Sequence, residues 1–103
     1  MYLYLIENII TQDSYVGKTH DLEKRWWQHK WNSKNGGTTH LYRAMRKYGI
    51  ESFSIKVLEY QADDVICSKR EIELIEELKP EYNMTRGGDG GDTSQSPKFK
   101  KSM

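Results

Sequence analysis

The sequence contains little that would cross-link the chain or carry it through a membrane. Cys67 is the single cysteine among 103 residues, which excludes an internal disulfide and a cysteine-based zinc cluster. We expect Cys67 to be a small buried side chain within a helix. No apolar run approaches the roughly 20 residues that a membrane-spanning helix needs, and the N-terminus lacks a signal-peptide pattern. These absences indicate a single globular domain in a reducing cytoplasm.

The net charge is also small, at +1, whereas typical nucleic-acid-binding domains are clearly basic. The charges are nevertheless distributed unevenly. Most acids lie in residues 59–81, and the basic residues of the segment 18–48 outnumber Asp21 and Glu23. A local basic region can attract a polyanion even when the net charge is near zero. The basic residues of this segment are Lys18, Lys24, Arg25, Lys30, Lys34, Arg43, Arg46 and Lys47.

Hydrophobic periodicity predicts the element order β-β-α-α-β-α. Apolar and β-branched residues dominate the first strand, and the turn-forming segment 11–14 separates it from the second. Asp21 suits the N-cap of the first helix, and Gly49 suits the C-terminal cap of the second. The fold class is therefore α/β, with a small three-stranded antiparallel sheet flanked by helices. The expected strands are 2–8, 14–18 and 52–60, and the expected helices are 22–33, 39–48 and 62–78.

The third predicted helix carries a stripe of apolar residues, and Pro80 ends it. Residues 81–85 are expected to be short and extended, in a segment that could return to the sheet. From Arg86 onward the chain is rich in Gly, Ser and Lys, the composition of a linker or disordered tail. We therefore expect one folded domain over residues 1–85 and a tail over residues 86–103. The apolar stripe consists of Val65, Ile66, Ile72, Ile75 and Leu78.

Several polar side chains on these elements could serve phosphodiester hydrolysis. That reaction needs a base for the attacking water, a cation for the developing charge and a stabilised leaving group. A carboxylate can hold Mg²⁺, which often uses only one or two protein carboxylates, and the arginine fork suits a phosphate. Each side chain alone more commonly has an ordinary role in strand packing or on a solvated helix face. The set comprises Tyr4, Tyr15, Arg25, His29, Glu71 and Asn83.

The joint order of these residues resembles the signature of the GIY-YIG nuclease superfamily. YLY at residues 2–4 and YVG at residues 15–17 match its two tripeptides, and Arg25 and His29 follow on the next helix. The resemblance covers residues 2–83 and is strongest to the catalytic domains of phage- and intron-encoded homing endonucleases. The resemblance implies that the protein acts inside a bacterial or phage-infected host cell. Further matching segments are KYG at 47–49, REIELIEEL at 70–78 and EYN at 81–83.

The resemblance also implies a role for each matched residue in DNA hydrolysis. Tyr4 would be the general base or would orient the attacking water, and Tyr15 would help to position water or phosphate. Arg25 would stabilise the transition state. His29 would hydrogen-bond Tyr4 or relay its proton, and the division of work among Tyr4, Tyr15 and His29 stays open.

The remaining matched residues would hold the metal and the substrate. Glu71 would bind the single divalent metal ion, Mg²⁺ or Mn²⁺, and Asn83 would anchor the geometry of the site. Gly17 would give close access to the scissile phosphate. The sequence departs from the family in the first tripeptide, where a tyrosine stands in place of glycine, and in the position of a loop histidine. Residues expected to contact DNA are Gly17, Lys18, Lys24 and His40, the last standing in for that histidine.

The sequence thus predicts a magnesium-dependent DNA endonuclease of the homing type, with site selection in a separate region or in the short basic tail. A restriction-type or repair-type nuclease and a non-catalytic nucleic-acid-binding module of the same fold are the alternatives. A protein-interaction domain is a further one, because α-helical spacing places Trp27 and Trp31 together and Trp26 toward the core. DNA is the expected partner, no membrane is involved, and the oligomeric state stays open, with a monomer compatible.

Overall fold

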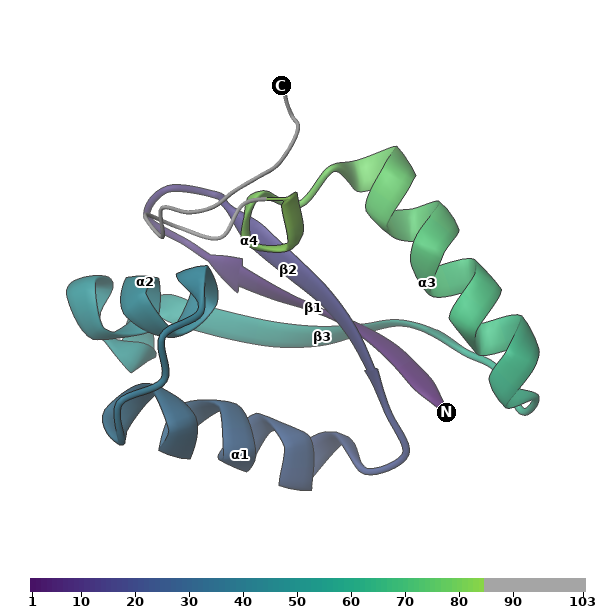
Figure 1. Ribbon diagram of the computed structural model, residues 1–103, viewed down its shortest axis with the longest axis horizontal. Coiled ribbons are helices and arrows are strands. Elements are labelled where there is room, and N and C mark those ends of the chain that lie inside the picture. The colour runs from purple at the N-terminus through teal and green to yellow at the C-terminus, as the bar shows by residue number, and fades with distance from the viewer. Residues whose placement is uncertain (85–103) are drawn as a thin grey trace.

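The computed structural model describes residues 1–84 as a three-stranded antiparallel sheet with helices on both sides of it (Figure 1). Strand β1 (Tyr2–Asn8) lies between β2 (Ser14–Thr19) and β3 (Phe53–Tyr60) and pairs antiparallel with both. The predicted fold class and element order are confirmed. The tail expected over residues 86–103 lies outside the described residues.

The helices begin and end where local capping chemistry favours it. Asp21 caps α1 (Leu22–Lys34) by accepting a hydrogen bond from the backbone N–H of Lys24 at 3.0 Å. Thr39 caps α2 (His40–Tyr48) in the same way, and Gly49 ends α2 at a positive φ of 91° that favours glycine. A short 3₁₀ turn, η1 (Ile50–Ser52), leads into β3, and α3 (Asp64–Leu78) and α4 (Glu81–Met84) follow it.

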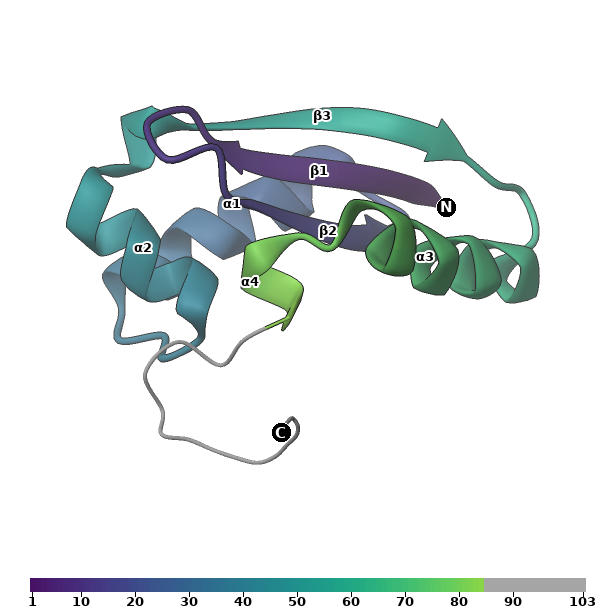
Figure 2. The same cartoon turned by 90° about the horizontal axis from the view of Figure 1, so that it is seen from above.

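The main core lies between the sheet and the α1–α2 pair. Alternation along β1 turns Tyr4 and Ile6 to this face, where they pack with Leu41 and Met45 of α2. Trp26 of α1 is half-buried against the same cluster, as the sequence predicts. Figure 2 shows α2 at one end of the strands and α3 near the other, with α1 passing behind the strands.

Helix α3 does not bury the apolar stripe that its sequence predicts. Val65, Ile66, Ile72 and Leu78 are 46–70% exposed, and Cys67 is the buried residue. Ile75 is the partly buried member of the stripe, and polar contacts accompany Cys67 on the packed side: Arg70 bonds Glu59 of β3 at 2.9 Å. The prediction was wrong because apolar residues occur all round this helix, so periodicity could not select the face that packs.

Two local details also differ from the prediction. Residues 81–84 form a helical turn rather than an extended segment, and they begin directly after the buried Pro80. In addition, the β1–β3 register shifts between Leu3 and Tyr4, which pair with Glu59 and Val57. Leu58 is therefore an extra residue in β3, and the alternation of its side chains changes there. None of the helices in the described part of the chain is long and apolar enough to cross a membrane.

Candidate active site

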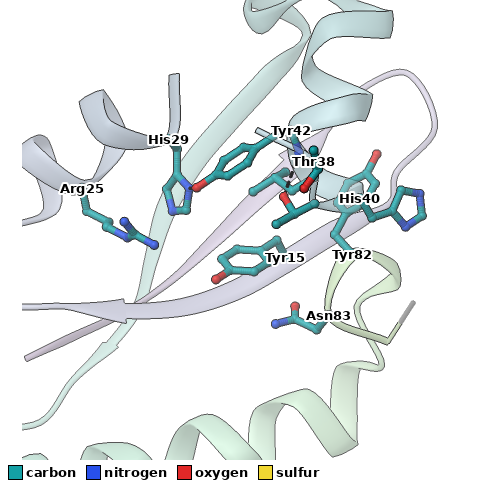
Figure 3. A pocket seen from close by; sticks show the side chains of 10 residues that line it. Tyr15, Arg25, His29, Thr38, His40, Tyr42, Tyr82 and Asn83 are labelled. Atoms are coloured by element: carbon teal, nitrogen blue, oxygen red, sulfur yellow. Dashed lines mark hydrogen bonds between the residues drawn. The ribbon is translucent and has the colours of Figure 1, made fainter. Parts of the chain in front are cut away.

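A cleft of about 430 Å³ opens where α1, α2, α4 and strand β2 meet (Figure 3). Strand β2 contributes Tyr15, α1 contributes Arg25 and His29, and the short α4 contributes Tyr82 and Asn83. The structure thus brings together side chains that are far apart in the sequence. The remaining lining residues come from α2 and the loop before it: Thr38, Thr39, His40, Leu41 and Tyr42.

A chain of buried hydrogen bonds runs behind the cleft. His29 Nε2 lies 2.8 Å from the Tyr4 hydroxyl, and His29 Nδ1 lies 3.0 Å from the Tyr42 hydroxyl. Asn32 donates from its side-chain amide to the same Tyr42 oxygen at 3.2 Å. Tyr4 and His29 are each only 1% exposed. The imidazole is therefore held on both ring nitrogens, and it links the base of the cleft to helix α2.

His29 is neutral at neutral pH. Burial, together with the nearby positive charge of Arg25, lowers the pKa of His29 to about 4. A neutral imidazole has one N–H and one bare nitrogen, so one tyrosine donates to the ring and the other accepts from it. Protonation would turn both ring nitrogens into donors, and the Tyr4 hydroxyl could then no longer donate to the ring.

The two tyrosines of the site are both protonated at neutral pH. Burial raises the pKa of Tyr4 well above its ordinary value, Tyr15 adds to the increase, and Arg25 opposes it. Burial also raises the pKa of Tyr15. The rings of Tyr4 and Tyr15 lie 6.4 Å apart, and that of Tyr15 lies 5.6 Å from His29. Arg25 is thus the side chain that brings positive charge to this aromatic cluster.

Gly17 is required by the Tyr4 ring. The two residues are paired across β1 and β2, so they share one face of the sheet. A Cβ atom at Gly17 would lie 2.5 Å from the Tyr4 hydroxyl oxygen and 2.6 Å from Tyr4 Cζ. The space that glycine leaves is therefore occupied by the phenol itself. The expected close approach of a phosphate at Gly17 stays a prediction.

The turn α4 is fixed to β2 by one side chain. The amide of Asn83 accepts from the Val16 N–H at 2.7 Å and donates to the Val16 carbonyl at 2.9 Å. Next to it, the Tyr82 hydroxyl accepts from Asn8 at 3.2 Å, and the ring packs edge-on against His40 at 4.9 Å. These contacts set the wall of the cleft opposite α1.

Comparison with known proteins assigns the chain to a family. The family model described as the GIY-YIG catalytic domain matches residues 1–83. The chain belongs to the GIY-YIG catalytic domain family. The resemblance predicted from the sequence is thereby confirmed.

The family members most informative here are viral proteins and one solved catalytic domain. "Putative endonuclease segB" and "Putative endonuclease segC" of Enterobacteria phage T4 are 34% and 31% identical to the chain over 96 residues. These alignments cover 87% of this chain but 40% and 44% of the relatives. The chain therefore spans about two fifths of the length of these curated relatives.

The solved structure of the catalytic domain of homing endonuclease I-TevI has a similar fold. It gives a TM-score of 0.71 at 28% identity and covers 88% of this chain and 98% of that chain. A second structure of that domain gives a TM-score of 0.70 at 27% identity, with 93% and 100% covered. The GIY-YIG domain of the present chain is thus matched over nearly the whole of an experimentally solved catalytic domain.

Glu71, the metal ligand expected from the sequence, is not among the residues that line the cleft. Glu71 on α3 is 3.3 Å from Lys18 Nζ on β2, and its side chain is 22% exposed. Lys18 also donates to Ser68 of α3 at 3.0 Å. The charge of Glu71 still reaches the cleft, because it contributes to the raised pKa of Tyr15.

The donor set fits a magnesium ion held mainly by water and substrate. Within residues 1–84 there is no group of three or more His, Cys, Asp or Glu side chains that could hold a metal alone. Mg²⁺ does not need such a group, because it commonly binds one or two carboxylates and keeps several waters. Glu71 is a partly exposed carboxylate that already neutralises a cation, the Lys18 ammonium. Its carboxylate could bind a divalent ion in the same way.

The residues expected to contact DNA are only partly brought to the cleft, and one residue of the site was missed. Lys24 is exposed on α1 and does not line the cleft, whereas His40 does. Tyr42, which the sequence analysis did not single out, holds His29 from the side opposite Tyr4. Its contact depends on how α1 crosses α2, so local spacing carries no signal for it.

Proposed function

We propose that this domain is a magnesium-dependent endonuclease that hydrolyses phosphodiester bonds of DNA, in the manner of homing endonucleases. The observation that carries the proposal is the buried Tyr4–His29 pair beside Arg25, at the base of a cleft on a GIY-YIG domain. The relatives from phage T4 are named as endonucleases, and the solved domain belongs to a homing endonuclease. A nuclease reaction on DNA is therefore the function best supported.

In this proposal the Tyr4 hydroxyl receives the proton of the attacking water. Because burial raises its pKa, Tyr4 does not act as a preformed phenolate. It acts instead by passing its own proton to His29 as it accepts one from water. That transfer requires the bare nitrogen of a neutral imidazole, and the lowered pKa of His29 keeps the ring neutral. Tyr15 lines the cleft and positions the water or the phosphate.

Arg25 stabilises the negative charge that develops on the phosphate. Its guanidinium borders the cleft next to His29 and Tyr15, and its planar fork can bind two phosphate oxygens at once. In a cleft partly shielded from water such a charge is worth more than at an open surface. Lys18, whose ammonium pairs with Glu71, would contact a flanking phosphate.

Glu71 would hold the divalent ion, Mg²⁺ or Mn²⁺, and Asn83 would keep α4 in place beside it. The ion would supply Lewis-acid stabilisation of phosphate and leaving-group oxygens. The protein itself fixes the Glu71 carboxylate at the edge of the cleft and holds the Lys18 ammonium next to that carboxylate. Gly17 keeps the Tyr4 ring in place, and His40 and Lys24 contact the substrate farther out.

A supercoiled-plasmid nicking assay tests this proposal. The wild type is expected to nick with Mg²⁺ and to lose activity in EDTA, and Arg25→Ala and Glu71→Gln are expected to be nearly inactive. Glu76→Gln is the matched control, because Glu76 lies on the same helix but is exposed. Equal activity of Glu71→Gln, Arg25→Ala and wild type would refute the assignment. Tight DNA binding without cleavage under any metal would favour the non-catalytic binding module.

A further inference from the structure

A pair of tryptophans on α1 has no role in the core or in the proposed reaction. Trp27 is 60% exposed and Trp31 is 50% exposed, as the sequence predicts for this helix face. Their rings stack on one another, with centroids 6.5 Å apart and planes at 28°. The buried residues of α1 are His29 and Ser33, so the indoles point away from the core.

The tryptophan pair lines a depression that shares Arg25 with the candidate active site. A second depression, of about 530 Å³, is lined by Arg25, Trp27, Gln28, Trp31 and Asn32. Arg25 also borders the cleft, and it bonds Gln28 at 3.2 Å. A strand of DNA whose phosphate lies on Arg25 would therefore meet the two indoles next.

Beyond the indoles the surface becomes basic. A third depression, of about 670 Å³, shares Trp27 and Trp31 with the second. Its basic residues are Lys30, Lys34 and Arg46, and Glu51 is the acid in its lining. Arg46 is fixed toward α1, because it donates to the Ser33 carbonyl at 2.8 Å. This arrangement of exposed rings next to cations suits a polyanion that also offers flat apolar faces.

We infer that the Trp27–Trp31 surface binds unpaired bases of the DNA that flanks the scissile phosphate. In a duplex the faces of the bases are covered by their neighbours, so an indole stacks most readily on a base that has left the helix. Proteins that bind single strands combine aromatic platforms with a positively charged groove in this way. The inference rests on the proposed function, since it places this strand in continuity with Arg25.

The surface is tested by DNA binding without cleavage. Fluorescence anisotropy in EDTA compares a labelled single strand with the blunt duplex of the same sequence, using the full chain. The wild type is expected to bind the single strand more tightly. The double variant W27A/W31A is expected to lose roughly 10-fold in single-strand affinity, and less than about threefold on the duplex. The double variant W27F/W31F should retain most of the affinity, because phenyl rings still stack.

A matched control removes exposed apolar side chains elsewhere. Val65 and Ile72 on α3 are 70% and 61% exposed, so V65A/I72A is expected to bind both DNAs like the wild type. Unchanged single-strand binding by W27A/W31A, or equal losses on both DNAs, would overturn the inference. The inference would also be overturned if W27A/W31A changed the sedimentation of the protein and left its DNA binding unchanged. That result would assign the surface to protein association.

The same experiments separate this inference from the endonuclease proposal. Tryptophan-dependent binding of single strands by a chain that nicks no plasmid would support the surface and refute the endonuclease. If the chain nicks plasmid but its single-strand binding does not change when both tryptophans are replaced, the endonuclease proposal is supported and the inferred surface is refuted.

Discussion

Tyr4 and Gly17 face one another across β1 and β2, and a methyl group at Gly17 would lie 2.5 Å from the Tyr4 hydroxyl oxygen. This contact includes the phenol that we place at the centre of the reaction. The backbone of Gly17 does not have a positive φ, so the structural need for glycine here is the space that the Tyr4 and Tyr15 rings occupy. The glycine of the second tripeptide and the tyrosine of the first are therefore one structural unit.

Gly17→Ala should accordingly cause a large loss of nicking activity and only a modest loss of folding free energy. Overpacking in a core costs about 1–3 kcal/mol, which the domain can tolerate, while displacement of the Tyr4 hydroxyl should reduce nicking at least ~10-fold. Gly49→Ala is the control, since Gly49 has a φ of 91° and an added Cβ would meet Glu51. It should destabilise the fold yet leave the rate per folded molecule unchanged. Urea unfolding and nicking rates measure the two effects, and an active Gly17→Ala chain would contradict this account.

Tyr42→Phe tests the support of His29. The substitution removes the hydroxyl that contacts His29 Nδ1 and Asn32. Loss of such a hydrogen bond costs about 1 kcal/mol of folding free energy, and misorientation of the imidazole should lower kcat about 5- to 10-fold with KM unchanged. Tyr48→Phe is the control, because Tyr48 packs against the core without lining the cleft. A higher KM at constant kcat would instead indicate that Tyr42 binds substrate.

His29 makes stability depend on pH. Its pKa is about 4 in the folded chain and 6.5 in an unfolded one, so between these values the folded chain binds fewer protons at this site. The stability contributed by neutral His29 is thus fully present above about pH 6.5 and is lost as the pH falls toward 4, by about 3 kcal/mol in total.

This loss can be measured by chemical denaturation at a series of pH values. The wild type should lose about 3 kcal/mol more than His29→Gln between pH 7 and pH 4, because glutamine does not titrate. Parallel profiles for the two proteins would show that His29 is not buried in its neutral form.

Asn83→Ala should loosen α4 without unfolding the sheet. Asn83 bonds both the N–H and the carbonyl of Val16, so we expect a loss of about 1–3 kcal/mol. Amide hydrogen exchange at Val16 should become faster than in the wild type. Asn83→Asp keeps the acceptor and loses the donor, so its effect should be intermediate. Unaltered exchange at Val16 in the alanine variant would show that α4 is held by other contacts.

The sequence predicts the strands and capped helices well because their signals are local. Asp21 and Gly49 act on the backbone within one turn, and the pairing of β1 with β2 follows from a short turn between two apolar stretches. Arg25 and His29 share a helix face by spacing alone. Helical spacing does not place them next to Tyr4. That contact could be predicted only from the resemblance to the family signature.

What failed depends on tertiary contacts. Helix α3 has apolar residues on every side, and its packed face includes Glu71 and Arg70, whose partners Lys18 and Glu59 lie on the strands. Residues 81–84 follow a buried proline, but the helical turn they form is fixed by the bonds of Asn83 to Val16. The role of Tyr42 depends on the crossing of two helices. The partners of each contact lie on different elements, so spacing within a single helix or strand does not relate them.

The bonds between Asn83 and Val16 also have a consequence for the solubility of the domain. β2 is an edge strand, and the main-chain groups of an edge strand can pair with a strand of another molecule. The Asn83 amide occupies the outward N–H and carbonyl of Val16 as a neighbouring strand would. A side chain that shapes the cleft thereby also protects the sheet from extension by a second chain, so loss of Asn83 should promote aggregation as well as impair the site.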